Sequence, residues 1–182
     1  EVWGVIENRE LLKSDHRKVN ARVLMHGPYG TGKSEAGMRT AVVAVENNTT
    51  FIQFRTGGRE GTLDALENTI NMARLYSPAV VFVEDVDVFA AEGTDDAYQS
   101  RLSNLFDGIN SKGDEVLIVM TSNKAASFSK AMLRAGRIDA MIEVGALNRE
   151  ATEEMARRVI GVERLAKDLD FDKIWAAMDG FE

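Results

Sequence analysis

Residues 27–34 read G-P-Y-G-T-G-K-S and match the complete G-x-x-x-x-G-K-[ST] pattern of a phosphate-binding loop. An apolar run over residues 21–27 leads into this motif, and a helical pattern from Glu35 to Val45 follows it. Glycines let the backbone curl so that several N–H groups point at one anion, and the helix adds the positive end of its dipole. A glycine-rich turn with an incidental lysine is the alternative, but the strand and helix patterns on either side favour a phosphate site.

Short apolar runs alternate along the chain with segments of helical spacing. The strand candidates cover residues 21–27, 49–54, 78–85, 115–123 and 141–146, and helical spacing occupies residues 62–77 and 96–109 between them. Most of these runs show little polar alternation, which is typical of strands buried on both faces of a parallel sheet. The order predicts an α/β fold, a P-loop three-layer αβα sandwich with a central parallel sheet.

The amino-acid composition excludes or disfavours several classes of protein. The chain has 182 residues, of which 45% are hydrophobic and 28% are charged, so it fits one globular domain or one domain and part of another. No apolar run approaches the ~20 residues that a membrane span needs. The absence of Cys excludes disulfides and thiolate metal sites, and we expect a cytoplasmic, intracellular location. A formal net charge of −7 disfavours a surface that coats nucleic acid.

Each residue type in the phosphate-binding motif has an expected task. Gly30 and Gly32 allow the curled backbone, Lys33 reaches the β- and γ-phosphates, and the Ser34 hydroxyl ligates Mg²⁺. The expected nucleotide site comprises Gly27, Pro28, Tyr29, Gly30, Thr31, Gly32, Lys33, Ser34 and Glu35.

An acidic pair, Glu84 and Asp85, ends the apolar run over residues 78–85. Active sites of parallel sheets lie beyond the carboxyl ends of the strands, so these carboxylates are expected to face the phosphates. One of them is expected to hold Mg²⁺ through its water shell, and the other to polarise the attacking water. Simple capping of the strand end is the alternative.

Over residues 20–160 the sequence resembles the AAA+ ATPases, and in particular the main AAA clade. The phosphate loop resembles G-P-P-G-T-G-K-T, and P-A-V-V-F-V-E-D-V-D resembles the family's P-x-I-I-F-I-D-E-I-D. The resemblance implies that Glu84, with Ser34, binds the metal and that Asp85 is the base. The run ending in T-S-N implies that Asn123 is the sensor-1 residue, which orients the lytic water.

The stretch K-A-M-L-R-A-G-R-I-D resembles the family's segment that bears the arginine fingers. The resemblance implies that Arg134 and Arg137 act on the nucleotide of a neighbouring subunit, in a homo-oligomeric ring expected to be a hexamer. ATP and Mg²⁺ are the implied cofactors. The implied activity is ATP hydrolysis coupled to remodelling or translocation of a macromolecule, with a protein substrate favoured over nucleic acid.

Two departures from the family keep alternatives open. The family writes Asp-Glu where this chain has Glu84-Asp85, and displacing a base by ~1 Å can cost ~10²-fold in rate. A nucleotide-gated assembly scaffold with little hydrolysis is therefore the main alternative. The stretch R-T-G-G-R-E-G at residues 55–61 replaces the aromatic pore loop, and its Arg55 and Arg59 suggest a nucleic-acid-acting subunit as a further alternative.

We expect two domains: a nucleotide-binding α/β domain at residues 1–147 and the truncated start of a helical lid at residues 148–182. From Asn148 onward the chain is helical in pattern and charged, with Asn148 as a helix cap. The chain opens at Glu1 without Met or a signal-peptide pattern, so we expect it to be a piece of a longer protein.

Overall fold

The structure is a computed structural model. It describes residues 2–17, 19–55, 62–87, 89, 100–102, 104–105, 115–124, 138–160 and 170–178. The chain divides into two compact units, Glu1–Val144 and Gly145–Glu182. The assignment of the second unit as the start of a lid remains a prediction.

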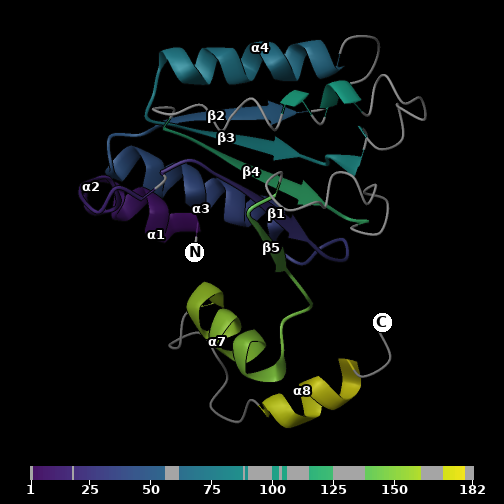
Figure 1. The fold of residues 1–182 in the computed structure, drawn as a ribbon. Helices are drawn as coiled ribbons and strands as arrows, with labels where there is room; N and C mark the ends of the chain where they lie inside the picture. Colours follow the sequence, from purple (N-terminus) through teal and green to yellow (C-terminus); the bar gives the residue numbers. More distant parts are fainter. Residues whose placement is uncertain are drawn as a thin grey trace. The chain divides into compact units, whose positions relative to one another are not determined.

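A five-stranded sheet forms the centre of the first unit (Figure 1). Its strands are β1 (Ala21–His26), β2 (Thr50–Arg55), β3 (Ala79–Glu84), β4 (Val116–Ser122) and β5 (Ala140–Glu143). Every pair of neighbours is parallel, and the order across the sheet is β2-β3-β4-β1-β5. Because all strands point the same way, their carboxyl ends meet at one edge, and the residues that follow β1, β3 and β4 are brought together there.

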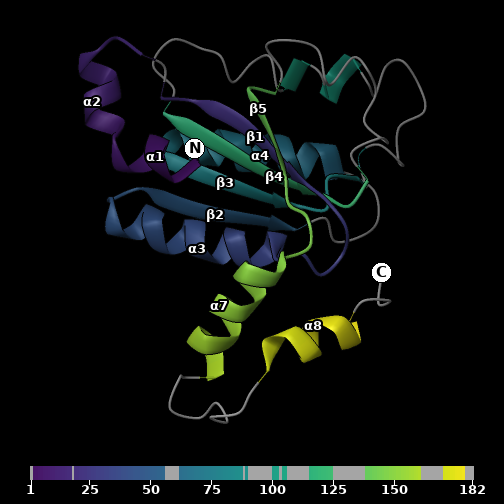
Figure 2. The same ribbon diagram turned by 90° about the horizontal axis from the view of Figure 1, so that it is seen from below.

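Helices cover both faces of this sheet (Figures 1 and 2). In the described part of the first unit, the helices with defined bounds are α1 (Val2–Glu7), α2 (Arg9–Ser14), α3 (Lys33–Glu46) and α4 (Thr62–Leu75). Successive side chains of β3 point to opposite faces, so Val81 lies in the core cluster with residues of α4, and Phe82 lies in the cluster with residues of α1 and α3. The predicted α/β fold with a central parallel sheet is confirmed.

The two short helices at the start of the chain had no counterpart in the sequence-based prediction. Val2 and Ile6, one helical turn apart in α1, are buried in the core cluster beneath α3. Trp3 adds a hydrogen bond from its indole Nε1 to Thr40 Oγ1 of α3, at 3.0 Å. A helix of six residues is not stable on its own, so this packing is what holds α1.

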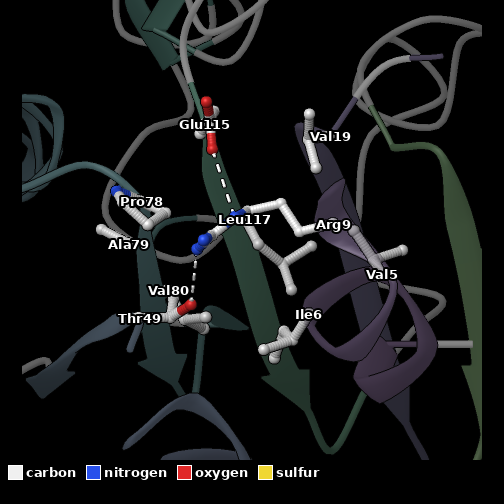
Figure 3. Close-up of a pocket in the computed structure, with 10 residues that line it drawn as sticks. All are labelled: Val5, Ile6, Arg9, Val19, Thr49, Pro78, Ala79, Val80, Glu115 and Leu117. Carbon is white, nitrogen blue, oxygen red and sulfur yellow. Dashed lines mark hydrogen bonds and ion pairs between the residues drawn. The ribbon is translucent and has the colours of Figure 1, made fainter. Parts of the chain in front are cut away.

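Helix α2 is joined to the sheet at the amino ends of the strands, where a small pocket lies (Figure 3). Arg9 Nη1 donates to Thr49 Oγ1 at 3.2 Å, and its Nε lies 3.5 Å from a carboxylate oxygen of Glu115. Lys13 Nζ lies 2.8 Å from the other oxygen of Glu115, and this hydrogen bond and the opposite charge raise the pKa of Lys13. Thr49 and Glu115 directly precede β2 and β4, so this pocket lies at the edge of the sheet opposite to the phosphate-binding loop.

An ion pair between a buried arginine and a partly exposed aspartate fixes strand β5 against strand β1. The guanidinium of Arg22 is only 3% exposed, and its Nε and Nη2 donate to the two carboxylate oxygens of Asp139 at 2.9 and 3.2 Å. The same carboxylate accepts the backbone N–H of Arg22 at 2.8 Å, and the N–H of Asp139 donates to the Arg22 carbonyl. Four hydrogen bonds therefore join the start of β1 to the residue before β5.

We expect Asp139→Ala to lower the free energy of unfolding by roughly 2–3 kcal/mol, because it removes the carboxylate that compensates a buried guanidinium. The expected loss is below the ~3–5 kcal/mol of a fully buried pair because the Asp139 side chain is 41% exposed. The measurement is urea denaturation, read as a lower midpoint at an unchanged slope. Asp64→Ala is the control, since Asp64 pairs with Arg101 on the surface and such pairs contribute ~0–1 kcal/mol. Equal midpoints for the two variants would contradict the prediction.

The second unit contains α7 (Arg149–Ile160) and α8 (Phe171–Met178). The predicted cap is confirmed, because Asn148 Oδ1 accepts the backbone N–H of Ala151 at 2.8 Å. Within this unit the Arg157 guanidinium lies over the Phe171 ring, 5.2 Å from its centroid. No helix among the described residues is long and apolar enough to cross a membrane.

Parts of several sequence-based predictions lie outside the described residues. The helix expected at residues 96–109 is described only at 100–102 and 104–105, where Leu102 is fully buried and Leu105 packs against the core. The loop that replaces the pore loop is described only at Arg55, and Arg134 and Arg137 lie outside the described part of the chain.

Candidate functional site

The phosphate-binding motif forms the connection between β1 and α3, as the sequence predicts. Gly30 and Gly32 have φ angles of 77° and 92°, in the left-handed region that favours glycine. Gly32 is the N-cap of α3, and Lys33 is its first residue. Ser34 and Glu35 follow in the exposed first turn of the helix. The positive end of the α3 dipole therefore lies at the loop, as an anion site requires.

Lys33 lies inside the curled loop rather than on its surface. The residue is 7% exposed, and its Nζ donates to the carbonyl oxygens of Gly27 at 2.8 Å and Pro28 at 2.6 Å. The Thr31 hydroxyl also donates to the Pro28 carbonyl, at 2.9 Å. Buried ammonium groups need such partners, and a phosphate oxygen is a stronger one than a carbonyl. The loop therefore carries a positive charge at its centre, where a phosphate would bind.

The ends of β3 and β4 bring Asp85 and Asn123 into contact. Asn123 Nδ2 donates to Asp85 Oδ1 at 2.9 Å, although 38 positions separate them in the sequence. Asp85 has a φ of 50°, which turns the chain out of β3, and its backbone N–H donates to Thr121 Oγ1 at 3.1 Å. A carboxylate and an amide that share a hydrogen bond at the edge of the sheet can bind and orient one water molecule.

The Glu84 side chain bonds residues of β2, the neighbour of β3 on the side away from β1. Its Oε2 accepts from Arg55 Nε at 3.1 Å and from Gln53 Nε2 at 3.2 Å, and both partners belong to β2. The Glu84 side chain is 17% exposed, whereas that of Arg55 is 73% exposed. In the sheet order, β2 and β1 lie on opposite sides of β3, so this pairing directs one Glu84 oxygen away from the strand that bears the phosphate loop.

Metal binding by Ser34 and Glu84 remains a prediction. Within the described part of the chain, no group of three or more His, Asp or Glu side chains is arranged to hold a metal ion. The donor set that the sequence predicts is a single hydroxyl and a single carboxylate. Mg²⁺ at nucleotide sites commonly takes its remaining ligands from phosphates and water.

Two residues at this edge were not singled out in the sequence. Thr121 accepts the Asp85 N–H through its hydroxyl, and Asp87 accepts hydrogen bonds from Ser122 and Asn123. The available signal was their position: Asp87 follows Asp85 by two residues, and Thr121 precedes Asn123 by two. Since β3 and β4 are neighbouring parallel strands, residues near their carboxyl ends are close in space.

A parallel sheet with a phosphate-binding loop after its β1 strand and polar residues after β3 and β4 defines a P-loop nucleotide-binding domain. The model of the "ATPase family associated with various cellular activities (AAA)" matches residues 23–146, which is more than half of the chain. The chain belongs to this AAA family. The predicted family, its ATPase class and its cofactors, ATP with Mg²⁺, are thereby confirmed at the level of the family.

Among curated proteins, proteasome-activating nucleotidase 2 of Halobacterium salinarum is 31% identical over 169 residues, covering 85% of this chain and 40% of that protein. The ATPase family gene 2 protein of Saccharomyces cerevisiae is 31% identical over 135 residues, covering 68% and 17%. The ATP-dependent zinc metalloprotease FtsH of Lactococcus lactis is 25% identical over 100% of this chain and 28% of that protein. The chain thus spans at most two fifths of the length of these three relatives.

Proposed function

We propose that the protein containing this chain binds ATP with Mg²⁺ and hydrolyses it at the boundary between subunits of a homo-oligomeric ring, expected to be a hexamer. Lys33 and the N–H groups of the loop bind the β- and γ-phosphates, and Ser34 and Glu84 bind the metal. The metal, when bound, neutralises charge that develops on the phosphates. Asp85 accepts a proton from the attacking water, and Asn123 orients that water.

The observation that carries this proposal is the 2.9 Å hydrogen bond between Asn123 Nδ2 and Asp85 Oδ1. It joins the expected base to the expected water-orienting residue. Because the strands are parallel, both residues lie at the same edge of the sheet as the loop that contains Lys33. Strand β4 lies directly between β1 and β3. Exposed Asp85 is the carboxylate with access to water, while Glu84 is mostly covered. The division of roles between the two acids follows from this difference.

The substrate class we propose is protein, and the coupled event is remodelling or translocation of that protein. The names of the relatives support this choice, since they include proteasome-activating nucleotidases and an ATP-dependent metalloprotease. The net charge of −7 also disfavours nucleic acid as the substrate. An intracellular location is part of this proposal.

Mixing of inactive subunits tests the ring and the shared site. We expect Asp85→Asn and Arg137→Ala to be inactive separately, because one lacks the base and the other lacks the arginine supplied to the neighbour. After mixing in equal amounts, about one subunit boundary in four combines an intact Asp85 with an intact Arg137. Steady-state phosphate release should therefore recover to roughly a quarter of the parent rate. A mixture no more active than its separate components would contradict the shared site, and Arg134→Ala is tested in the same way.

A second candidate, a nucleotide-gated scaffold, is favoured by a specific observation. Glu84 is held by Arg55 and Gln53 of β2, which competes with its expected role at the metal. The base position also carries the shorter Asp85. A protein of this kind assembles with ATP and releases it intact. Phosphate release by the parent protein distinguishes the two candidates.

A further inference from the structure

Asp87 is a third acidic residue at the carboxyl edge of the sheet, and it bonds the end of β4. Its Oδ1 accepts from Ser122 Oγ at 2.6 Å, and its Oδ2 accepts from the backbone N–H of Asn123 at 2.8 Å. Ser122 is fully buried, and its Oγ also accepts the backbone N–H of Lys124 at 3.0 Å. These bonds fix the backbone on both sides of the Asn123 side chain.

Asp87 is itself held in place by buried neighbours. The N–H of Val86 donates to the Thr121 carbonyl at 2.9 Å, and Val86 is 2% exposed. The N–H of Phe89 donates to the Val86 carbonyl at 3.1 Å, and the Phe89 ring, 1% exposed, stacks on Phe54 with centroids 6.4 Å apart. A carboxylate between two such anchors has little freedom to move.

We infer that Asp87 is a positioning residue for ATP hydrolysis, which acts by setting Asn123 so that its amide meets Asp85. This inference rests on the proposed function, because it assigns Asn123 and Asp85 to the attacking water. Asp87 bonds the backbone N–H of Asn123, and the Asn123 amide bonds the expected base, Asp85. The effect of Asp87 that we infer passes along this path.

Both side-chain oxygens of Asp87 are needed as hydrogen-bond acceptors. A carboxylate accepts hydrogen bonds at both oxygens, and both partners here, a hydroxyl and a backbone N–H, are donors. An asparagine at this position accepts at one end only, because its other end is an NH₂ donor. In Asp87→Asn the Asn123 N–H or the Ser122 hydroxyl therefore loses its acceptor. A shift of ~1 Å in a water-orienting group can cost as much as ~10²-fold in rate.

A double-mutant cycle tests the inference in the intact protein. We expect Asp87→Asn to lower kcat at least ~10-fold with the KM for ATP within ~2-fold, since it disturbs the group that orients the attacking water and no group assigned to binding ATP. Asn123→Ala should lower kcat at least as much. If Asp87 acts through Asn123, the double variant is no slower than Asn123→Ala alone. Losses that multiply in the double variant would overturn the inference, and so would an Asp87→Asn enzyme with parental kcat.

Asp64→Asn is the matched control, because it removes an exposed carboxylate of α4 that pairs with Arg101, and we expect parental kcat and KM. Hydrogen exchange of the Asn123 backbone amide provides a readout that needs no turnover. In Asp87→Ala, which removes both acceptor oxygens, this amide should exchange at least ~10-fold faster, while amides of β1 keep their protection. If the parent protein shows no phosphate release, the proposed function fails, and the exchange rate still decides the structural part of the inference, that Asp87 holds the backbone of Asn123. An unchanged rate for the Asn123 amide overturns it.

Discussion

Replacing Lys33 with alanine is expected to weaken ATP binding by at least ~100-fold. Lys33 is 7% exposed, and its ammonium lies within 2.8 Å of two loop carbonyls, at the centre of the curled motif. A hydrogen bond to a charged group contributes ~1.5–3 kcal/mol, and the ammonium is placed to bond more than one phosphate oxygen. Since 1.4 kcal/mol corresponds to tenfold in affinity, loss of two such bonds exceeds ~100-fold.

Calorimetric titration with a non-hydrolysable ATP analogue measures this loss of affinity. Arg39→Ala is the control, since Arg39 is an exposed cation on the same helix, and its removal should leave the affinity within ~2-fold. Lys33→Met retains most of the aliphatic stem, so it separates loss of charge from loss of packing. Unchanged affinity in a folded Lys33→Ala protein would show that the loop does not bind the phosphates.

Asp85→Asn is expected to lower the rate of phosphate release by at least ~10²-fold, the lower range of a general base, while ATP affinity stays within ~3-fold. The amide oxygen of asparagine can still accept from Asn123 Nδ2, so the 2.9 Å contact is retained and only the basicity is lost. The measurement is steady-state phosphate release, repeated at several protein concentrations to include the assembled state.

Three outcomes of this experiment have distinct meanings. Turnover in the parent that is lost in Asp85→Asn supports the ATPase. No turnover in either protein supports the nucleotide-gated scaffold. Turnover retained by the variant shows that Asp85 is not the base. Asp85→Glu restores the longer side chain that the family's pattern has at this position, and we expect it to raise kcat severalfold if the missing methylene limits the rate.

Several features of the fold and site were predictable because they depend on local patterns. Apolar runs such as residues 79–83 predict buried parallel strands, and β3 lies where the sequence places it. The contact between Asp85 and Asn123 was also within reach, since both residues directly follow strands of one parallel sheet. The site roles of Lys33, Ser34, Glu84, Arg134 and Arg137 remain predictions.

Other features were not predictable from the sequence. Helices α1 and α2 are too short for a clear periodic pattern. Burial of Val2 and Ile6 in the cluster that includes residues of α3 stabilises α1, whereas Arg9 and Lys13 attach α2 to Thr49 and Glu115. The pairing of Glu84 with Arg55 depends on β2 lying beside β3, at the edge of the sheet farthest from β5. Neither the sequence of β2 nor that of β3 shows by itself that the two strands are neighbours.

The sequence by itself determined which segments become strands, where the phosphate-binding loop lies, and that acidic and amide side chains follow the strands. Periodicity, glycine placement and apolar runs are local properties, and each segment carries its own. Only the tertiary structure decided that Glu84 bonds Arg55 and that Asp87 bonds the backbone of Asn123. These contacts depend on the order of strands across the sheet, which is set by packing between segments distant in the sequence.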